Sequence, residues 1–262
     1  MYERALFSMS QVFTLANHKG GVGKSSVCFG LADALEVLGR SVLVVDLDPQ
    51  ASITKFTGID TTELPTMADL FALDEVHAIG EICITTDCGF DLAPSDIVLA
   101  TQEQHRRLGD EQFLKKAMEM DPLDYDEVLI DCPPSLGLLT VNALIAADAL
   151  MVITQPNYAS LKGIRELMTT YEKVREFYNE DLEVVGAIVN MVERTRECGL
   201  RVKELEGYFE EVLWTPYIPK RVAVAEAQGM NTRLSKHKAN NAATKAFHNL
   251  AERMIHRGER SR

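Results

Sequence analysis

A glycine-rich stretch near the amino end constrains the fold of this chain more than any other feature. Residues 17–26 read NHKGGVGKSS, and they stand between the apolar run 12–16 and the helical pattern 27–38. A loop of this kind lets backbone N–H groups curl inward, where they and the N-terminus of the following helix can hold phosphate oxygens. The order of strand, loop and helix therefore predicts a phosphate-binding loop.

The side chains of this loop support the same interpretation. Lys24 is expected to lie along the outer phosphates of a nucleotide, and the Ser25 hydroxyl to ligate a magnesium ion that bridges them. Three glycines and two lysines at this place argue against a glycine-rich turn without a ligand. The predicted nucleotide contacts in the loop are Lys19, Gly20, Gly21, Val22, Gly23, Lys24, Ser25 and Ser26.

The loop departs from the usual pattern at its start. Such loops begin with a glycine where this chain has His18, and a second lysine, Lys19, follows. The segment 19–25 resembles the deviant Walker A motif of ParA, MinD and the nitrogenase iron protein, a class of dimeric ATPases. The resemblance implies ATP as substrate, Mg²⁺ as cofactor, a homodimer in the ATP state, and a catalytic role for Lys19 at the partner's nucleotide.

Apolar runs along the chain predict an α/β fold. Short runs that suit strands alternate with longer amphipathic ones that suit helices; the predicted strands cover residues 12–16, 41–46, 127–131, 149–154, 184–190 and 214–218. This alternation predicts one domain with a twisted, mostly parallel sheet, helices on both faces, and ligands at the carboxyl ends of the strands. We expect that domain over residues 12–256, a flexible extension over 1–11 and a basic tail over 257–262.

Two aspartates follow the second predicted strand, where residues 46–52 read DLDPQAS. On an extended chain, Asp46 and Asp48 would point to the same side. The segment resembles switch I of the ParA family. Phosphoryl transfer needs a well-placed water more than a strong base, so we expect Asp48 to position that water and Asp46 to support magnesium. The alternative is an aspartate pair that caps a loop.

A third motif is the apolar strand that ends at Asp131, before Cys132 and two prolines. This pattern is typical of a Walker B strand. Asp131 would bind magnesium through water, and the stiff turn after it would start a switch II loop. A buried strand with a turn explains the apolar part equally well, and both readings can hold.

Two later segments resemble the parts of ParA proteins that contact adenine. Residues 186–191 end in Asn190, which is expected to read the base edge, and in Met191, which would pack nearby. Residues 215–227 resemble the block after the sixth strand, where Pro219 is expected to close over the base.

Charge is distributed unevenly. The net charge is −12, but residues 212–262 carry ten Lys or Arg and three Glu. A locally basic end on an acidic body can bind a polyanion through its phosphates, without reading sequence. The candidate contacts to double-stranded DNA are Lys220, Arg221, Arg233, Lys236, Lys238 and Lys245; ordinary solvated surface charge is the alternative for each.

The resemblance implies a cycle of partition. In the ParA family, ATP joins two monomers into a sandwich that binds DNA nonspecifically, and a ParB-like partner stimulates hydrolysis and release. The protein would be cytoplasmic and associated with the nucleoid, where it would segregate a chromosome, a plasmid or a protein cargo. ATP turnover is expected to be slow without the partner.

Two other classes of function stay open. A MinD-like membrane ATPase would need an amphipathic C-terminal helix, and such a face exists in Ala246, Phe247, Leu250, Ala251, Met254 and Ile255, although a helix packed on the domain explains it more simply. The other class is a metabolic or electron-transfer ATPase on the same fold. The five cysteines lack the spacing of an iron–sulfur site, so we expect reduced thiols, with Cys132 facing the core.

Overall fold

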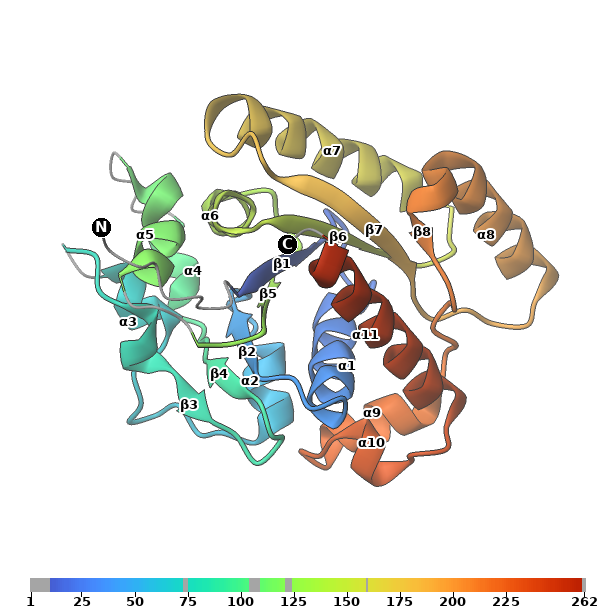
Figure 1. The fold of residues 1–262 in the computed structure, drawn as a ribbon, viewed down its shortest axis with the longest axis horizontal. Helices are drawn as coiled ribbons and strands as arrows, with labels where there is room; N and C mark the ends of the chain where they lie inside the picture. The colour runs from blue at the N-terminus through green and yellow to red at the C-terminus, as the bar shows by residue number, and fades with distance from the viewer. Residues whose placement is uncertain (1–9, 73–74, 104–108, 121–123, 159, 261–262) are drawn as a thin grey trace.

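The protein is represented by a computed structural model, which describes residues 10–72, 75–103, 109–120, 124–158 and 160–260. A sheet of eight strands forms the centre of the described part (Figure 1). The N-terminal extension expected over residues 1–11 lies outside the described residues except for Ser10 and Gln11.

The sheet has the parallel arrangement that the sequence predicts. Its strands are β1 (Gln11–Ala16), β2 (Val42–Asp46), β3 (Ile84–Thr85), β4 (Asp91–Ala93), β5 (Glu127–Asp131), β6 (Ala149–Thr154), β7 (Glu183–Val189) and β8 (Leu213–Trp214). They lie in the order β3-β4-β2-β5-β1-β6-β7-β8. All neighbouring pairs are parallel except β3 with β4. The carboxyl ends of β1, β2 and β5 therefore meet at one edge.

Three strands differ from the prediction. The strand expected over residues 214–218 is only Leu213–Trp214, because Pro216 has no N–H for a sheet ladder. The other two, β3 and β4, are absent from the prediction. Runs of two and three residues are too short to form a periodic pattern.

Helices cover both faces of the sheet. They are α1 (Lys24–Val37), α2 (Ser52–Thr57), α3 (Met67–Ala72), α4 (Leu99–Gln102), α5 (Phe113–Glu119), α6 (Leu138–Ala146), α7 (Ser160–Phe177), α8 (Arg196–Phe209), α9 (Val222–Gly229), α10 (Leu234–His237) and α11 (Ala242–Arg260). One core lies between the sheet and α1, α9, α10 and α11. The other lies between the sheet and α3, α5, α6, α7 and α8 (Figure 1).

The alternation of side chains along the strands supplies both cores. In β5, Val128 and Ile130 belong to the core under α6 and α7, and Leu129 belongs to the core under α1. A strand buried on both faces needs apolar residues at every position, which is why these strands read as continuous apolar runs.

Helix α11 packs along α1 with its apolar side (Figure 1). Phe247 lies so close to Gly30 that a methyl group on the glycine would be 2.5 Å from the ring. The other buried side chains of this face are Ala243, Ala246, Leu250, Ala251 and Met254. Since these side chains are in the core, they are not free to enter a bilayer in this conformation. None of the helices in the described ranges is long and apolar enough to span a membrane.

Candidate nucleotide site

The loop between β1 and α1 has the backbone shape that its glycines permit. Gly21 and Gly23 have φ angles of 76° and 83°, in the left-handed region that favours glycine. A methyl group on Gly23 would lie 2.4 Å from the Asn190 Nδ2 atom, so a side chain has no room there. Lys24 is the first residue of α1 and is 6% exposed. The predicted loop therefore lies at the carboxyl end of β1.

Two asparagines fix this loop to the ends of other strands. Asn17 Nδ2 donates to the Ile153 carbonyl of β6 at 2.6 Å, and its Oδ1 accepts from the Lys19 N–H at 3.1 Å. After β7, Asn190 Nδ2 donates to the Val22 carbonyl at 3.0 Å. The loop is thus braced from two strands that are far away in sequence.

The side chains of His18 and Lys19 meet the segment that follows β6. Lys19 Nζ donates to Asn157 Oδ1 at 2.7 Å, and the same oxygen accepts from Ser160 Oγ at 2.9 Å. His18 Nδ1 lies 2.7 Å from Glu166 Oε2 on α7. The Lys19 ammonium is therefore held by an amide oxygen of its own chain.

Asp46 and Asp131 end neighbouring strands in register, and both are fully buried. Asp46 Oδ2 accepts from the Thr54 N–H at 3.0 Å and from Thr54 Oγ1 at 2.9 Å, and its Oδ1 accepts from the Asp48 N–H at 3.3 Å. Burial raises the pKa of Asp46 to about 6; the Thr54 and Asp48 hydrogen bonds oppose this rise, and the Asp48 charge adds to it.

Asp131 lacks such donors. Neither of its carboxylate oxygens has a hydrogen-bond partner of normal geometry among the described residues. Burial raises its pKa well above the ordinary value, and the nearby Asp46 raises it further, while Ser25 and Lys24 lower it. A buried carboxylate without a partner is costly, and a hydrated cation beside the loop would relieve that cost. The residues present therefore fit magnesium.

Magnesium in this position would keep much of its water. Among the residues that the structure describes, no three His, Cys, Asp or Glu side chains are grouped closely enough to hold a metal ion. Magnesium commonly binds one or two carboxylates, several waters and substrate phosphates. The thiols are free, and Cys132 is buried in the core as predicted.

Asp48 lies in a tight turn. β2 ends at Asp46, and the turn follows at residues 49 and 50, so Asp48 begins the turn just past the end of the strand. Asp48 Oδ1 accepts from the Gln50 N–H at 2.9 Å, and its carbonyl accepts from the Ala51 N–H at 2.7 Å. Asp48 is 8% exposed and stays close to Asp46 through the backbone bond described above.

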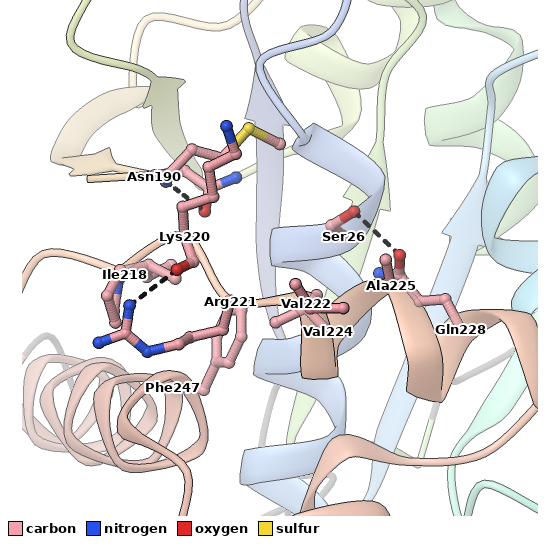
Figure 2. Close-up of a pocket in the computed structure, with 12 residues that line it drawn as sticks. Ser26, Asn190, Ile218, Lys220, Arg221, Val222, Val224, Ala225, Gln228 and Phe247 are labelled. Atoms are coloured by element: carbon pink, nitrogen blue, oxygen red, sulfur yellow. Dashed lines mark hydrogen bonds between the residues drawn. The ribbon is translucent and has the colours of Figure 1, made fainter. Parts of the chain in front are cut away.

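A pocket of about 350 Å³ lies beside the loop (Figure 2). The predicted adenine contacts Asn190, Met191 and Pro219 all line it, together with apolar side chains from the segment after β8, from α9 and from α11. An apolar pocket of this size with a few polar groups suits an aromatic base. Both polar atoms of the Asn190 amide form hydrogen bonds within the protein, because its Nδ2 donates to Val22 and its Oδ1 accepts from the Met191 N–H at 2.9 Å. That it reads the base edge stays a prediction.

Sequence analysis missed two side chains of this pocket. Gln228 on α9 accepts a hydrogen bond from Ser26 Oγ at 3.4 Å, and Phe247 on α11 forms part of the wall (Figure 2). Both lie outside every motif. The only signal for Phe247 is the apolar periodicity of the C-terminal helix, which predicts burial and not a ligand.

The six candidate DNA contacts differ in their surroundings. Lys220 pairs with Glu193 at 2.7 Å, and Arg233 is paired with Glu36 beside Asp33. The remaining four are exposed to solvent: Arg221, Lys236, Lys238 and Lys245. Arg233, with 22% of its side chain exposed, has the character of a structural residue more than of a phosphate contact.

Comparisons with known proteins agree with this geometry. Residues 10–184 match the family model described as an AAA domain. Together with the parallel sheet and the glycine-rich loop, this match defines a P-loop ATPase.

Relatives that match over nearly the whole chain identify the family within the class of P-loop ATPases. The chain is 32% identical over 253 residues to the sporulation initiation inhibitor protein Soj of Bacillus subtilis, which covers 95% of this chain and 100% of the relative. It is 34% identical over 261 residues to the chromosome partitioning protein ParA of Caulobacter vibrioides, covering 96% of each. The chain therefore belongs to the ParA/Soj family of partition ATPases.

Solved structures share the fold. Cobyrinic acid a,c-diamide synthase from Mycobacterium smegmatis, with a bound ATP analogue and magnesium, has a TM-score of 0.83 and 30% identity over 97% of each chain. The septum site-determining protein MinD of Pyrococcus horikoshii, complexed with Mg-ADP, has a TM-score of 0.75 and 23% identity, covering 94% of this chain and 96% of that one. At that identity the likeness to MinD concerns the fold alone.

Proposed function

We propose that this protein is a DNA-tethered partition ATPase. Two ATP-bound copies form a sandwich dimer that binds DNA nonspecifically, and hydrolysis stimulated by a ParB-like partner releases it. The observation that carries the proposal is the meeting of the glycine-rich loop with Asp48 and Asp131 at one edge of the sheet, beside a pocket that suits a base. The cycle would segregate a chromosome, a plasmid or a protein cargo on the nucleoid, in the cytoplasm.

The residues of the loop would hold ATP. Backbone N–H groups of residues 20–26 would donate to the phosphates, and the Lys24 ammonium would lie along the outer ones. Ser25, Asp46 and Asp131 would hold magnesium, which neutralises charge on the transferring phosphoryl group. Asp48 would orient the attacking water, and Met191 and Pro219 would pack on the base. Such a site depends on positioning, so we expect slow turnover without the partner.

The surroundings of Lys19 support a dimer. Its ammonium is bound to the neutral Asn157 amide, so it can exchange that contact for a phosphate without breaking an ion pair. In the sandwich we expect Lys19 to reach the nucleotide of the second copy. Asn157 would then hold the lysine in the single chain.

Exposed cations on and around α9, α10 and α11 support DNA binding. Arg221, Lys236, Lys238 and Lys245 would contact phosphates, and Lys220 and Arg233 could join them only by leaving their acidic partners. Phosphate contacts carry no base identity, so binding would be independent of sequence and sensitive to salt.

DNA binding in different nucleotide states tests the proposal. We would measure binding of wild type and Asp48→Ala to nonspecific double-stranded DNA with ATP, with ADP and without nucleotide, at two salt concentrations. Salt-sensitive binding that ATP alone switches on, and that Asp48→Ala retains, is the expected result. Absence of DNA binding in every state would overturn the DNA-tethered cycle and favour a MinD-like membrane ATPase or a metabolic ATPase.

A further inference from the structure

Thr54 lies between the end of β2 and the segment that follows β4. It is 3% exposed and sits in the first turn of α2. Its hydroxyl oxygen lies 2.9 Å from Asp46 Oδ2 and 3.0 Å from the backbone nitrogen of Ser95, which is fully buried. One hydroxyl therefore joins the end of β2 to a residue that lies 41 positions after Thr54 in the chain.

The two partners fix the direction of the hydroxyl proton. The Ser95 N–H can only donate, so it occupies a lone pair of the Thr54 oxygen. The Thr54 proton must then point to the Asp46 carboxylate, which accepts. Turning the hydroxyl away from Asp46 would leave a buried donor unpaired, which is costly.

The two carboxylate oxygens of Asp46 differ in how many further hydrogen bonds they can accept. Each carboxylate oxygen accepts about two hydrogen bonds. Oδ2 already receives the Thr54 N–H and the Thr54 hydroxyl, whereas Oδ1 receives, from the part of the chain that the structure describes, only the Asp48 N–H, at 3.3 Å. The remaining acceptor position of Asp46 is therefore on Oδ1.

We propose that Thr54 is a positioning residue for the magnesium-dependent reaction, because it saturates Oδ2 of Asp46 and so presents Oδ1 to the water shell of the metal. The inference rests on the proposed ATPase function. Packing needs only the shape of Thr54, and the link to Ser95 needs its oxygen as an acceptor. The proposed role differs from both, because it ties the hydroxyl to the dependence on Mg²⁺.

Substitutions at Thr54 separate shape from hydroxyl. Thr54→Val keeps the shape and removes both the donor to Asp46 and the acceptor of the Ser95 N–H, and Thr54→Ser keeps both. Mutations of residues that orient metal ligands commonly cost 10–100-fold in metal affinity or activity. We therefore expect Thr54→Val to raise the Mg²⁺ concentration for half-maximal binding of a fluorescent ATP analogue roughly tenfold, without changing affinity in EDTA, and Thr54→Ser to stay within about twofold of wild type.

Two variants serve as matched controls. Thr57→Val removes another hydroxyl of the same helix, which donates to the Thr54 carbonyl at 2.7 Å and does not touch Asp46. Ser95→Ala removes a buried hydroxyl without a partner among the described residues and keeps the N–H that Thr54 needs. Both should retain the Mg²⁺ dependence of wild type. Thermal unfolding of each variant reports any loss of fold.

Two results would overturn the assignment: an unchanged Mg²⁺ dependence in Thr54→Val, or an equal shift in Thr54→Ser and Thr54→Val. If Thr54→Val does not fold, the comparison of Thr54→Ser with Thr57→Val decides, and a Mg²⁺ shift in the serine variant contradicts the proposal. Failure of wild type to bind the ATP analogue at all would instead refute the proposed function.

Discussion

The two ends of the candidate nucleotide site are built in different ways. The phosphate end is polar and is formed by short motifs, with Lys24, Asp46 and Asp131 all nearly or fully buried. The base end is mostly apolar, and its wall comes from α1, the end of β7, the segment after β8, α9 and α11. Chemistry on a phosphate requires particular residue types, while enclosing a base requires only shape and apolar surface. At the phosphate end, the effect of a substitution on binding or hydrolysis should therefore depend on which chemical group is removed. At the base end, it should depend on how much side-chain volume is removed.

The largest effect is expected at the phosphate end, from Lys24→Ala. Loss of a buried ammonium beside the phosphates removes charge-assisted hydrogen bonds of about 1.5–3 kcal/mol each, so ATP affinity should fall on the order of 100-fold. Titration with a fluorescent ATP analogue measures this affinity. The exposed Lys203→Ala is the control, and equal affinities of the two variants would contradict the burial argument.

Asp131→Asn should reduce the reaction more than it reduces binding. The substitution keeps the shape and removes the charge, so we expect hydrolysis to fall roughly 10–100-fold while affinity for ATP in EDTA is retained. Steady-state hydrolysis and equilibrium binding separate the two quantities. The nucleotide-free variant should be no less stable than wild type, because the carboxylate has no partner of normal hydrogen-bond geometry among the described residues and its charge is repelled by Asp46. A large fall in its melting temperature would indicate a partner that the geometry does not reveal.

Gly23→Ala tests the contact between the two ends. The new methyl group would meet Asn190 Nδ2 at 2.4 Å, whereas a methyl group on Gly21 has nothing within 4 Å. Both positions have positive φ, so Gly21→Ala carries the same backbone strain without the clash. Overpacking costs typically 1–3 kcal/mol, so ATP affinity should be about tenfold weaker for Gly23→Ala than for Gly21→Ala. Equal losses would mean that Asn190 moves aside freely.

The smallest effect is expected at the base end, from Val222→Ala. Val222 is 73% exposed and lines the pocket, so the substitution should not disturb the fold. Loss of about two methyl contacts with the base weakens binding by roughly 1 kcal/mol, or about fivefold. The effect should appear in KM and leave kcat unchanged, because the base does not react. A changed kcat would show that α9 acts on the phosphate end.

The contrast between the polar phosphate end and the apolar base end also explains which parts of the site could be predicted from sequence. The parallel sheet, the glycine-rich loop and the positions of Asp46, Asp48 and Asp131 are local patterns, and five of the six predicted strands lie where the sequence puts them. Phe247 and Gln228 gave no such signal, because their part in the pocket depends on the packing of α11 against α1 and on the hydrogen bond from Ser26 of α1 to Gln228 of α9. Thr54 was also missed, since its partner Ser95 follows β4, a strand too short to recognise.

The packing of Phe247 against Gly30 has a consequence for synthesis. About 200 residues separate α1 from α11, so at roughly 5–20 residues per second α1 leaves the ribosome some tens of seconds before its cover exists. During that interval the phosphate loop has been synthesised, but α11, which forms part of the wall of the base pocket, has not. The side of α1 that α11 covers is then exposed to solvent. The chain therefore completes its nucleotide pocket only after α11 has been synthesised and has packed on α1.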